Sequence, residues 1–372
     1  MTMENFAPLM FLGLILIMLI GFPVAFSLAT LGLLSGFYAI EMGWFPASFM
    51  SNLPLNIFGI LSNDLLLAIP FFTLMGAILE KCGLAEDMLD SMGQLFGPVR
   101  GGLGYSVIIV GFILGAITGT VAGQVIAMAM ISLPVMMRYN YNMRYATGVL
   151  AASGTITQLV PPSLVLVVMA DQLGRSVGDM YKGAWGPSML QVLLFVAYTF
   201  VLSRLKPDYL PGVPKEARTL NGWALWKMCL RGIIPSAILI FAVLGSMGGL
   251  PGINTAICTP TEAGAMGAVG AFILAALHRR LDWPIVREGM LGTMRITAMV
   301  VFILIGSRVF SLVFQGVDGA KWIEHMLSNL PGGQVGFLIV VNIFVFFLRS
   351  EEHTSESSHL GISYAVFCLK KK

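Results

Sequence analysis

Small and hydroxyl-bearing residues gather at three points where long apolar segments are interrupted. These points read GAITGTVAG at 115–123, SGTITQLVPPS at 153–163 and CTPTEA at 258–263. Hard cations such as Na⁺ prefer oxygen ligands, and a helix unwound by Pro or Gly offers backbone carbonyls without adding a net charge. The three breaks are therefore the candidate positions of an ion or substrate site.

The first break lies at the centre of Gly101–Met137, a charge-free run that is too long for one membrane span. Thr118, Gly119 and Thr120 stand there between two apolar arms. We predict a re-entrant hairpin over about 102–134, with its tip at these three residues near the middle of the membrane. The alternative is two ordinary spans joined by a tight turn, or helices packed closely through small residues.

The second break carries adjacent prolines, Pro161 and Pro162, inside a helix expected over about 145–170. Proline lacks an N–H and clashes with a preceding carbonyl, so the carbonyls from about Thr157 to Val160 lose their helical partners. Nearby side chains add further oxygen atoms: Thr155, Thr157, Gln158 and Ser163. The alternative is a proline kink whose freed groups are satisfied by neighbouring helices.

The third break places Thr259, Thr261 and Glu262 between two apolar runs. An ionisable residue inside a membrane is expensive and is by default a functional candidate. A carboxylate at a helix start near the membrane surface, stabilised by the helix dipole, is an equal alternative. For Asp64, which precedes another apolar run, we favour the helix-start interpretation.

The composition excludes several classes of protein. Of 372 residues, 57% are apolar and 11% are charged, and the mean hydropathy is +0.84. A soluble domain averages about 25% charged residues. An ordinary cytosolic enzyme is therefore excluded, and a net charge of +3 spread over the chain provides no nucleic-acid surface. The motifs HExxH and GxSxG, a P-loop and paired histidines are absent from the sequence, so we expect no enzymatic activity and no cofactor.

Charge-free runs of about 20 residues or more predict an all-α polytopic protein embedded in the lipid bilayer. The run Phe6–Ile40 exceeds one span, and we expect a break near Gly21–Pro23. The segment Arg204–Arg231 has six basic and two acidic residues and three prolines. The positive-inside rule places it in the cytoplasm.

The charged segment Arg204–Arg231 suggests a division of the chain. We predict a first membrane repeat over 1–204, a cytoplasmic linker over 205–228 and a partial second repeat over 229–348, because internal repeats are common in secondary transporters. The tail at 349–372 breaks the pattern and resembles a translated sequencing adapter joined to a gene fragment. We interpret it as an artefact. A genuine short cytoplasmic tail is the alternative.

Four stretches in order resemble the large membrane subunit of a TRAP transporter (tripartite ATP-independent periplasmic transporter). They read LLLAIPFFTLMGAILEKCGLAEDM, GAITGTVAGQVIAMAMISLP, ATGVLAASGTITQLVPPS and ICTPTEAGAMGAV. The resemblance implies an inverted-repeat elevator of the ion-transporter superfamily in the bacterial inner membrane. It also implies a small four-span membrane subunit, a periplasmic substrate-binding protein and sodium-driven symport of a small organic acid such as a dicarboxylate.

The chain departs from the family pattern at two points. Relatives commonly carry Ser-Gly-Ser at the hairpin tip and Gly where Thr157 stands here. The family's second hairpin and second broken helix would follow Leu348, so we expect the natural protein to continue beyond it, with the second repeat incomplete as written. A related anion carrier that works without a binding protein is the alternative function.

Overall fold

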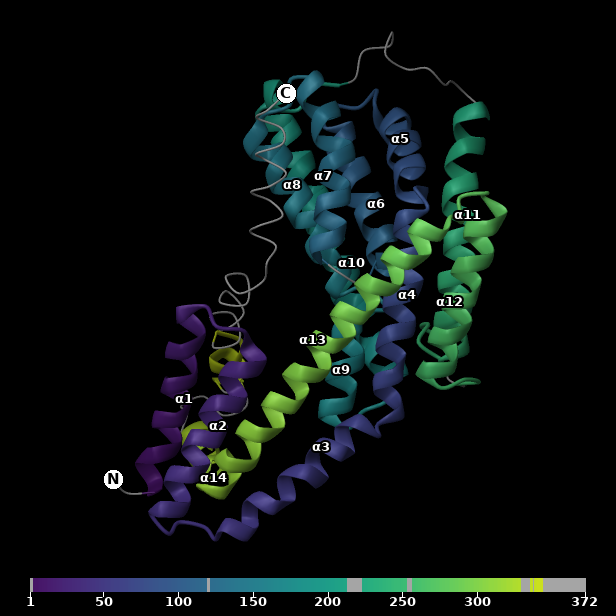
Figure 1. Cartoon of the computed structure of the whole chain (residues 1–372). Coiled ribbons are helices and arrows are strands. Elements are labelled where there is room, and N and C mark those ends of the chain that lie inside the picture. The colour runs from purple at the N-terminus through teal and green to yellow at the C-terminus, as the bar shows by residue number, and fades with distance from the viewer. Residues whose placement is uncertain are drawn as a thin grey trace. The chain divides into compact units, whose positions relative to one another are not determined.

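The computed structural model describes residues 3–118, 121–212, 223–252, 256–328, 335–336 and 338–343. Within these ranges the structure is helical and contains no strands (Figure 1). The α-helices are α1 (Met3–Ile20), α2 (Val24–Glu41), α3 (Leu53–Leu61), α4 (Ala68–Lys81), α5 (Leu84–Phe96), α6 (Gly102–Thr118), α7 (Val121–Arg138), α8 (Met143–Thr155), α9 (Leu164–Leu173), α10 (Val177–Leu205), α11 (Trp223–Ser246), α12 (Pro260–Leu277), α13 (Trp283–Gly316) and α14 (Gly319–Ser328). Short 3₁₀ helices are η1 (Ala47–Asn52), η2 (Asp64–Leu67), η3 (Ile156–Gln158) and η4 (Pro207–Tyr209).

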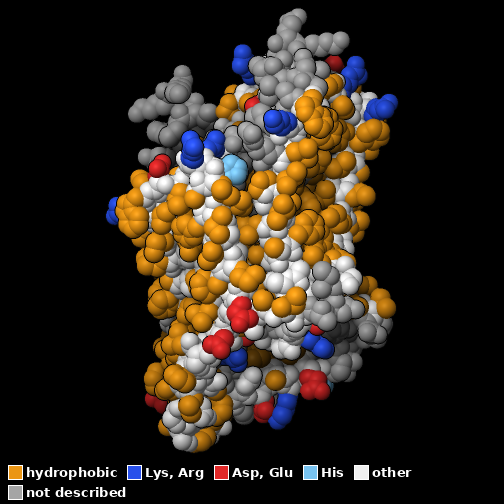
Figure 2. Space-filling view, turned by 90° about the vertical axis from the view of Figure 1, so that its right-hand side faces the viewer, with side chains coloured by type: hydrophobic (Ala, Val, Ile, Leu, Met, Phe, Trp, Pro, Cys, Tyr) orange, Lys and Arg blue, Asp and Glu red, His pale blue; other side chains and the backbone are white. Residues whose placement is uncertain are grey.

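Four of the described helices, α2, α10, α12 and α13, are long and apolar enough to cross a membrane. A fifth span results if the bent pair formed by η1–α3 and η2–α4 is counted as one. Shorter apolar helices include α9 and much of α6 and α7. Hydrophobic side chains cover most of the face shown in Figure 2. The protein is thus an all-α polytopic membrane protein, as its composition predicts.

The helices form two compact units. One comprises the described residues up to Asn63 and from Thr297 onward, and the other comprises Asp64–Ile296. Helix α13 contributes to both. A compact unit records which helices pack together, whereas a repeat records related sequence, so the repeat boundaries drawn from the sequence stay a prediction.

The first unit contains the predicted break in the N-terminal apolar run. Helix α1 ends at Ile20 and α2 begins at Val24, which confirms the break expected near Gly21–Pro23. Gly21 has φ 93°, a left-handed conformation that favours glycine. The core of this unit contains Phe6, Met10, Phe45 and Phe314, among others.

The second unit holds the three sequence breaks, and its helices approach closely at glycines. A Cβ atom on Gly264 of α12 would lie 3.1 Å from the Phe71 Cβ of α4. A Cβ on Gly267 would lie 2.7 Å from the Met75 sulfur. Such small residues let membrane helices pack tightly where hydrophobicity alone supplies little driving force.

The predicted cytoplasmic linker is described only in part. It contains η4, its residues 213–222 lie outside the described ranges, and α11 begins at Trp223. The tail at 349–372, which we interpret from the sequence as an artefact, also lies outside the described residues.

Candidate functional site

The arms of the predicted hairpin are α6 and α7, which pack against one another. Thr118 is the last residue of α6, whereas Gly119 and Thr120 lie outside the described residues. The structure therefore gives the arms of the hairpin but does not place its tip.

The second break interrupts the helix after Thr155 and ends where α9 begins at Leu164. The backbone N–H groups of Leu159 and Val160 both donate to the Ile156 carbonyl, at 3.0 and 3.1 Å. The Ser163 hydroxyl donates to the Gln158 carbonyl at 2.7 Å. Some of the freed backbone groups thus find hydrogen-bond partners within the turn that carries Pro161 and Pro162. The Ser163 hydroxyl provides one of these hydrogen bonds.

Gln124 of α7 connects the hairpin to the broken helix, and sequence reasoning missed it. Its side-chain N–H donates to the Gly111 carbonyl of α6 at 2.6 Å, and its Oε1 accepts from the Thr157 hydroxyl of η3. Both Gln124 and Thr157 are fully buried. An amide inside an otherwise apolar arm is the signal that could have identified it, because a buried polar group requires partners.

Small residues permit this close approach. A Cβ atom on Gly115 of α6 would lie 3.1 Å from the Thr157 Cα and 3.3 Å from its backbone nitrogen. A Cβ on Gly154 of α8 would clash with a Val125 methyl of α7. The first two sequence breaks are therefore packed together through backbone and buried polar contacts, with Val160 also buried.

Thr155 faces a further polar side chain. Its hydroxyl donates to the Ala152 carbonyl at 2.7 Å and accepts from the Gln191 side-chain nitrogen of α10 at 3.3 Å. The Gln191 Oε1 is buried and has no hydrogen-bond partner among the described residues. This arrangement adds an amide oxygen near the second break, from a helix that the sequence did not indicate.

The third break forms the start of α12. The Thr259 hydroxyl accepts from the Glu262 N–H at 3.3 Å, and the Glu262 carboxylate accepts from the Thr259 N–H at 2.8 Å. The Thr259 and Thr261 hydroxyls lie 3.0 Å apart. This is a capping box, which satisfies free N–H groups at a helix start. Of the two interpretations of Glu262, this geometry matches the helix-start carboxylate.

The third break shares neighbours with the first two. Helix α12 packs against α4 and α11, and α4 also contacts α6 and α9, which flank the first and second breaks.

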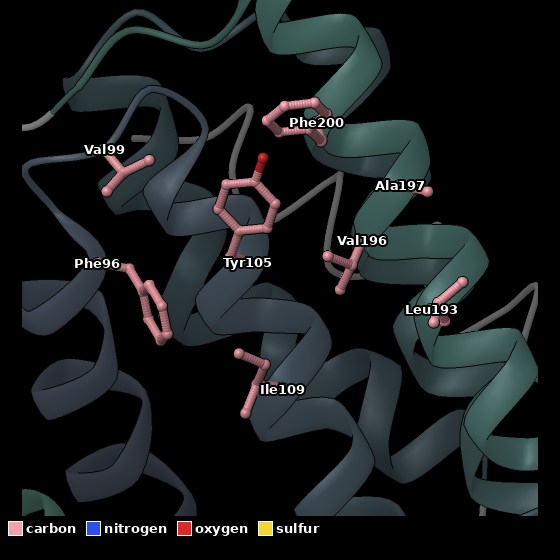
Figure 3. A pocket seen from close by; sticks show the side chains of 8 residues that line it. All are labelled: Phe96, Val99, Tyr105, Ile109, Leu193, Val196, Ala197 and Phe200. Atoms are coloured by element: carbon pink, nitrogen blue, oxygen red, sulfur yellow. The ribbon is translucent and has the colours of Figure 1, made fainter.

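An apolar groove of about 530 Å³ lies between α5, α6 and α10 (Figure 3). Its lining comprises apolar side chains and Tyr105. None of the residues that the sequence predicts for an ion or substrate site lines this groove.

Comparison with known proteins identifies the family. Residues 11–350 match the family described as Tripartite ATP-independent periplasmic transporter, DctM component. The C4-dicarboxylate TRAP transporter large permease protein DctM of Pseudomonas aeruginosa is 30% identical over 312 residues, which are 82% of this chain and 69% of that protein.

Two further relatives have other named substrates. The 2,3-diketo-L-gulonate TRAP transporter large permease protein YiaN of Escherichia coli is 26% identical, with coverage of 91% of this chain and 76% of that protein. The isethionate TRAP transporter permease protein DctMQ of Oleidesulfovibrio alaskensis is 23% identical, with 92% and 51% covered. The chain therefore belongs to the DctM family, the large permease components of TRAP transporters, and is a multi-pass inner-membrane transport protein and not an enzyme.

Proposed function

We propose that this chain imports a small organic acid across the bacterial inner membrane, driven by a sodium gradient and without ATP. The supporting observation is the buried contact between Thr157 of the broken helix and Gln124 of the hairpin. Irregular backbone inside a membrane is tolerated where protein or a water-filled cavity surrounds it, and such breaks form the ion sites of secondary transporters. The relatives named for C4-dicarboxylates and 2,3-diketo-L-gulonate support an acid as the substrate.

The proposed sodium ligands are uncharged oxygen atoms at the first two breaks. The Thr157 hydroxyl donates its proton to Gln124, and its oxygen carries lone pairs that can bind a cation. The backbone carbonyls around Thr157 and Val160 and the hydroxyls of Thr118 and Thr120 complete this set. The buried Oε1 of Gln191 is a further oxygen close to Thr155.

We further propose two partners. A small membrane subunit of about four spans binds this chain, and a soluble periplasmic protein delivers the substrate. The tripartite description of the family supports both partners. An anion carrier that works without a binding protein is the competing function.

Reconstitution tests the proposal. The substrate is first found by measuring which small organic acids raise the melting temperature of the candidate binding protein. The complete complex is then placed in proteoliposomes with that labelled acid and an inward sodium gradient. Matched samples lack the binding protein, lack the small subunit, or contain a sodium ionophore. We expect uptake only in the complete sample with an intact gradient.

The possible results separate the components of the proposal. Uptake without the binding protein, at the rate of the complete sample, supports the competing carrier. Uptake that is unchanged by the ionophore contradicts sodium coupling while leaving the tripartite assignment in place.

A further inference from the structure

The apolar groove between α6 and α10 has an open side and a basic end. Leu193 and Phe200 of α10 line it and are 62% and 51% exposed, and Ile109 lines it from α6. Leu193 and Phe200 are separated by about 10 Å along the helix, at 1.5 Å per residue. In Figure 3 these side chains border an elongated space, with Phe200 and Val99 at one end and Leu193 and Ile109 at the other.

Basic residues surround the end of the groove where Phe200 and Val99 lie. The Arg204 guanidinium lies over the Phe200 ring, 5.2 Å from its centre. Arg100 follows Val99 directly, and both are exposed. A Cβ atom on the next residue, Gly101, would lie 3.7 Å from the Ser203 Cβ of α10, so the Arg100 turn packs against the last turns of that helix.

Further polar groups lie at the same end. Lys206 follows the end of α10 and places its ammonium 5.0 Å from the centre of the Tyr209 ring. The Tyr105 hydroxyl points toward the Phe200 end in Figure 3. Within residues 96–105 and 200–212 the only acidic residue is Asp208, so positive charge predominates at this end.

We propose that this groove binds one anionic glycerophospholipid. An acyl chain lies along the apolar wall, and the phosphate lies between Arg100 and Arg204, with Lys206 and Tyr105 as further donors. Arginine presents several N–H groups in a planar fork that matches phosphate oxygens. Basic residues at the cytoplasmic surface favour anionic lipids, and the positive-inside rule assigns Arg204 and Lys206 to that surface.

The two parts of the site have different roles. An acyl chain is already in hydrocarbon before it enters the groove, so burial there adds little hydrophobic driving force. The charged end therefore supplies the preference for anionic over zwitterionic headgroups. The groove fixes where the lipid lies.

Native mass spectrometry of the purified transporter complex tests the proposal, with phosphatidylglycerol and phosphatidylcholine as probes. We expect phosphatidylglycerol to bind preferentially. The double variant Arg100→Gln/Arg204→Gln should weaken its binding by about fivefold per arginine, because one basic residue at the membrane surface contributes roughly that factor. The charge-matched control is Arg175→Gln/Arg279→Gln, whose exposed arginines are in the same unit. Arg175 precedes the start of α10, at the opposite end of that helix from Arg204.

A second pair of variants tests the groove independently of its charges. Ala197 lines the groove, so Ala197→Trp fills it. Leu194→Trp, on a neighbouring exposed position of α10 that does not line the groove, is the control. A filled groove keeps the headgroup from reaching the arginines at its end. We therefore expect Ala197→Trp to reduce phosphatidylglycerol binding about fivefold relative to Leu194→Trp, the loss expected for one charge contact.

Three outcomes of the binding measurements would overturn the proposal. They are equal binding of the two lipids, equal losses in the arginine variant and its charge-matched control, and unchanged binding after Ala197→Trp. A cross-link from an Ala197→Cys variant to a protein helix, with no lipid retained, would also overturn it in favour of a protein partner. All substituted side chains are exposed, so size-exclusion profiles that match the wild type exclude misfolding as the cause of a loss.

Discussion

Gln124 and Thr157 form a buried polar contact between the hairpin arm α7 and the second break. The Gln124 side chain donates to the Gly111 carbonyl and accepts from the Thr157 hydroxyl, so one amide of α7 satisfies groups on two other elements. Polar groups buried without partners cost free energy, and a membrane offers no water to replace them. We infer that this amide holds the broken helix against the hairpin.

Replacing Gln124 by leucine tests that role. Gln124→Leu keeps a similar volume but leaves the Thr157 hydroxyl without its acceptor. We expect the free energy of unfolding in mixed micelles to fall by about 1–3 kcal/mol. The control, Gln172→Leu, changes an exposed glutamine of α9 and should stay within about 0.5 kcal/mol of wild type. Equal losses in the two variants would contradict the role assigned to Gln124.

The hydroxyls at the hairpin tip provide a test of the ion site. Thr118→Ala and Thr120→Ala each remove one proposed sodium ligand. Each variant thereby loses about one charge-assisted contact, so the sodium concentration for half-maximal uptake should rise several-fold. Sodium titrations of uptake in proteoliposomes measure this. The control is Thr147→Ala in α8, where an exposed hydroxyl donates to the Met143 carbonyl. Sodium dependence that matches wild type in both tip variants would remove these residues from the site.

Helix α6 approaches the second break at Gly115, where a side chain would make an unusually tight contact. A Cβ atom there would lie 3.1 Å from the Thr157 Cα, which is a backbone atom and cannot move aside easily. Gly148 of α8 is the opposite case, since a Cβ there would meet nothing within 4 Å. The two helical glycines thus differ in what a side chain added at each would contact.

Alanine substitution should separate these two glycines. Alanine is intrinsically better than glycine in a helix by about 1 kcal/mol, so Gly148→Ala should be neutral or stabilising. Gly115→Ala should instead destabilise by about 1–3 kcal/mol, because the added methyl overpacks the contact with η3. Thermal unfolding and uptake rates measure both. A Gly115→Ala variant as stable as Gly148→Ala would mean that the contact is looser than the structure indicates.

The capping box at the start of α12 can also be tested by substitution. Thr259→Ala removes the N-cap and should lower the free energy of unfolding by about 1 kcal/mol. Glu262→Gln keeps an oxygen acceptor for the Thr259 N–H, so stability and uptake should stay close to wild type if Glu262 acts as a cap. Abolished uptake in Glu262→Gln, with unchanged stability, would instead indicate that its charge takes part in transport.

The basic end of the second unit predicts how the chain crosses the membrane. Helix α10 has 29 residues, about 43 Å at 1.5 Å per residue, which exceeds a ~30 Å hydrocarbon core. Its last turn carries Arg204, and Lys206 and Asp208 follow it. The start of α10 and the end of α9, including Gln172, should therefore face the periplasm.

Cysteine labelling tests this orientation. Asp208→Cys and Gln172→Cys place thiols at exposed positions beyond opposite ends of α10, in a background whose four native cysteines are replaced by alanine. In spheroplasts a membrane-impermeant maleimide should modify Gln172→Cys at once and Asp208→Cys only after permeabilisation. The reverse pattern would place the linker in the periplasm and contradict the positive-inside assignment.

The sequence alone determined the class of the protein and where its helices break. A break depends on covalent properties of the residues present, such as the missing N–H of proline and the left-handed freedom of glycine. The end of α1 at Ile20, the start of α2 at Val24 and the interruption between Thr155 and Leu164 follow from such local features. The four motif stretches also indicated the family, which the match over residues 11–350 shows.

Only the tertiary structure decided which groups meet. Thr157 and Gln124 are separated by 33 positions, and no periodic pattern in the sequence predicts their contact. The closeness of Gly115 to Thr157, the Gln191 amide beside Thr155 and the basic end of the groove likewise depend on how helices distant in sequence pack. Partner choice for a buried polar group is a property of packing, because many arrangements satisfy the same local sequence and only the folded chain selects one.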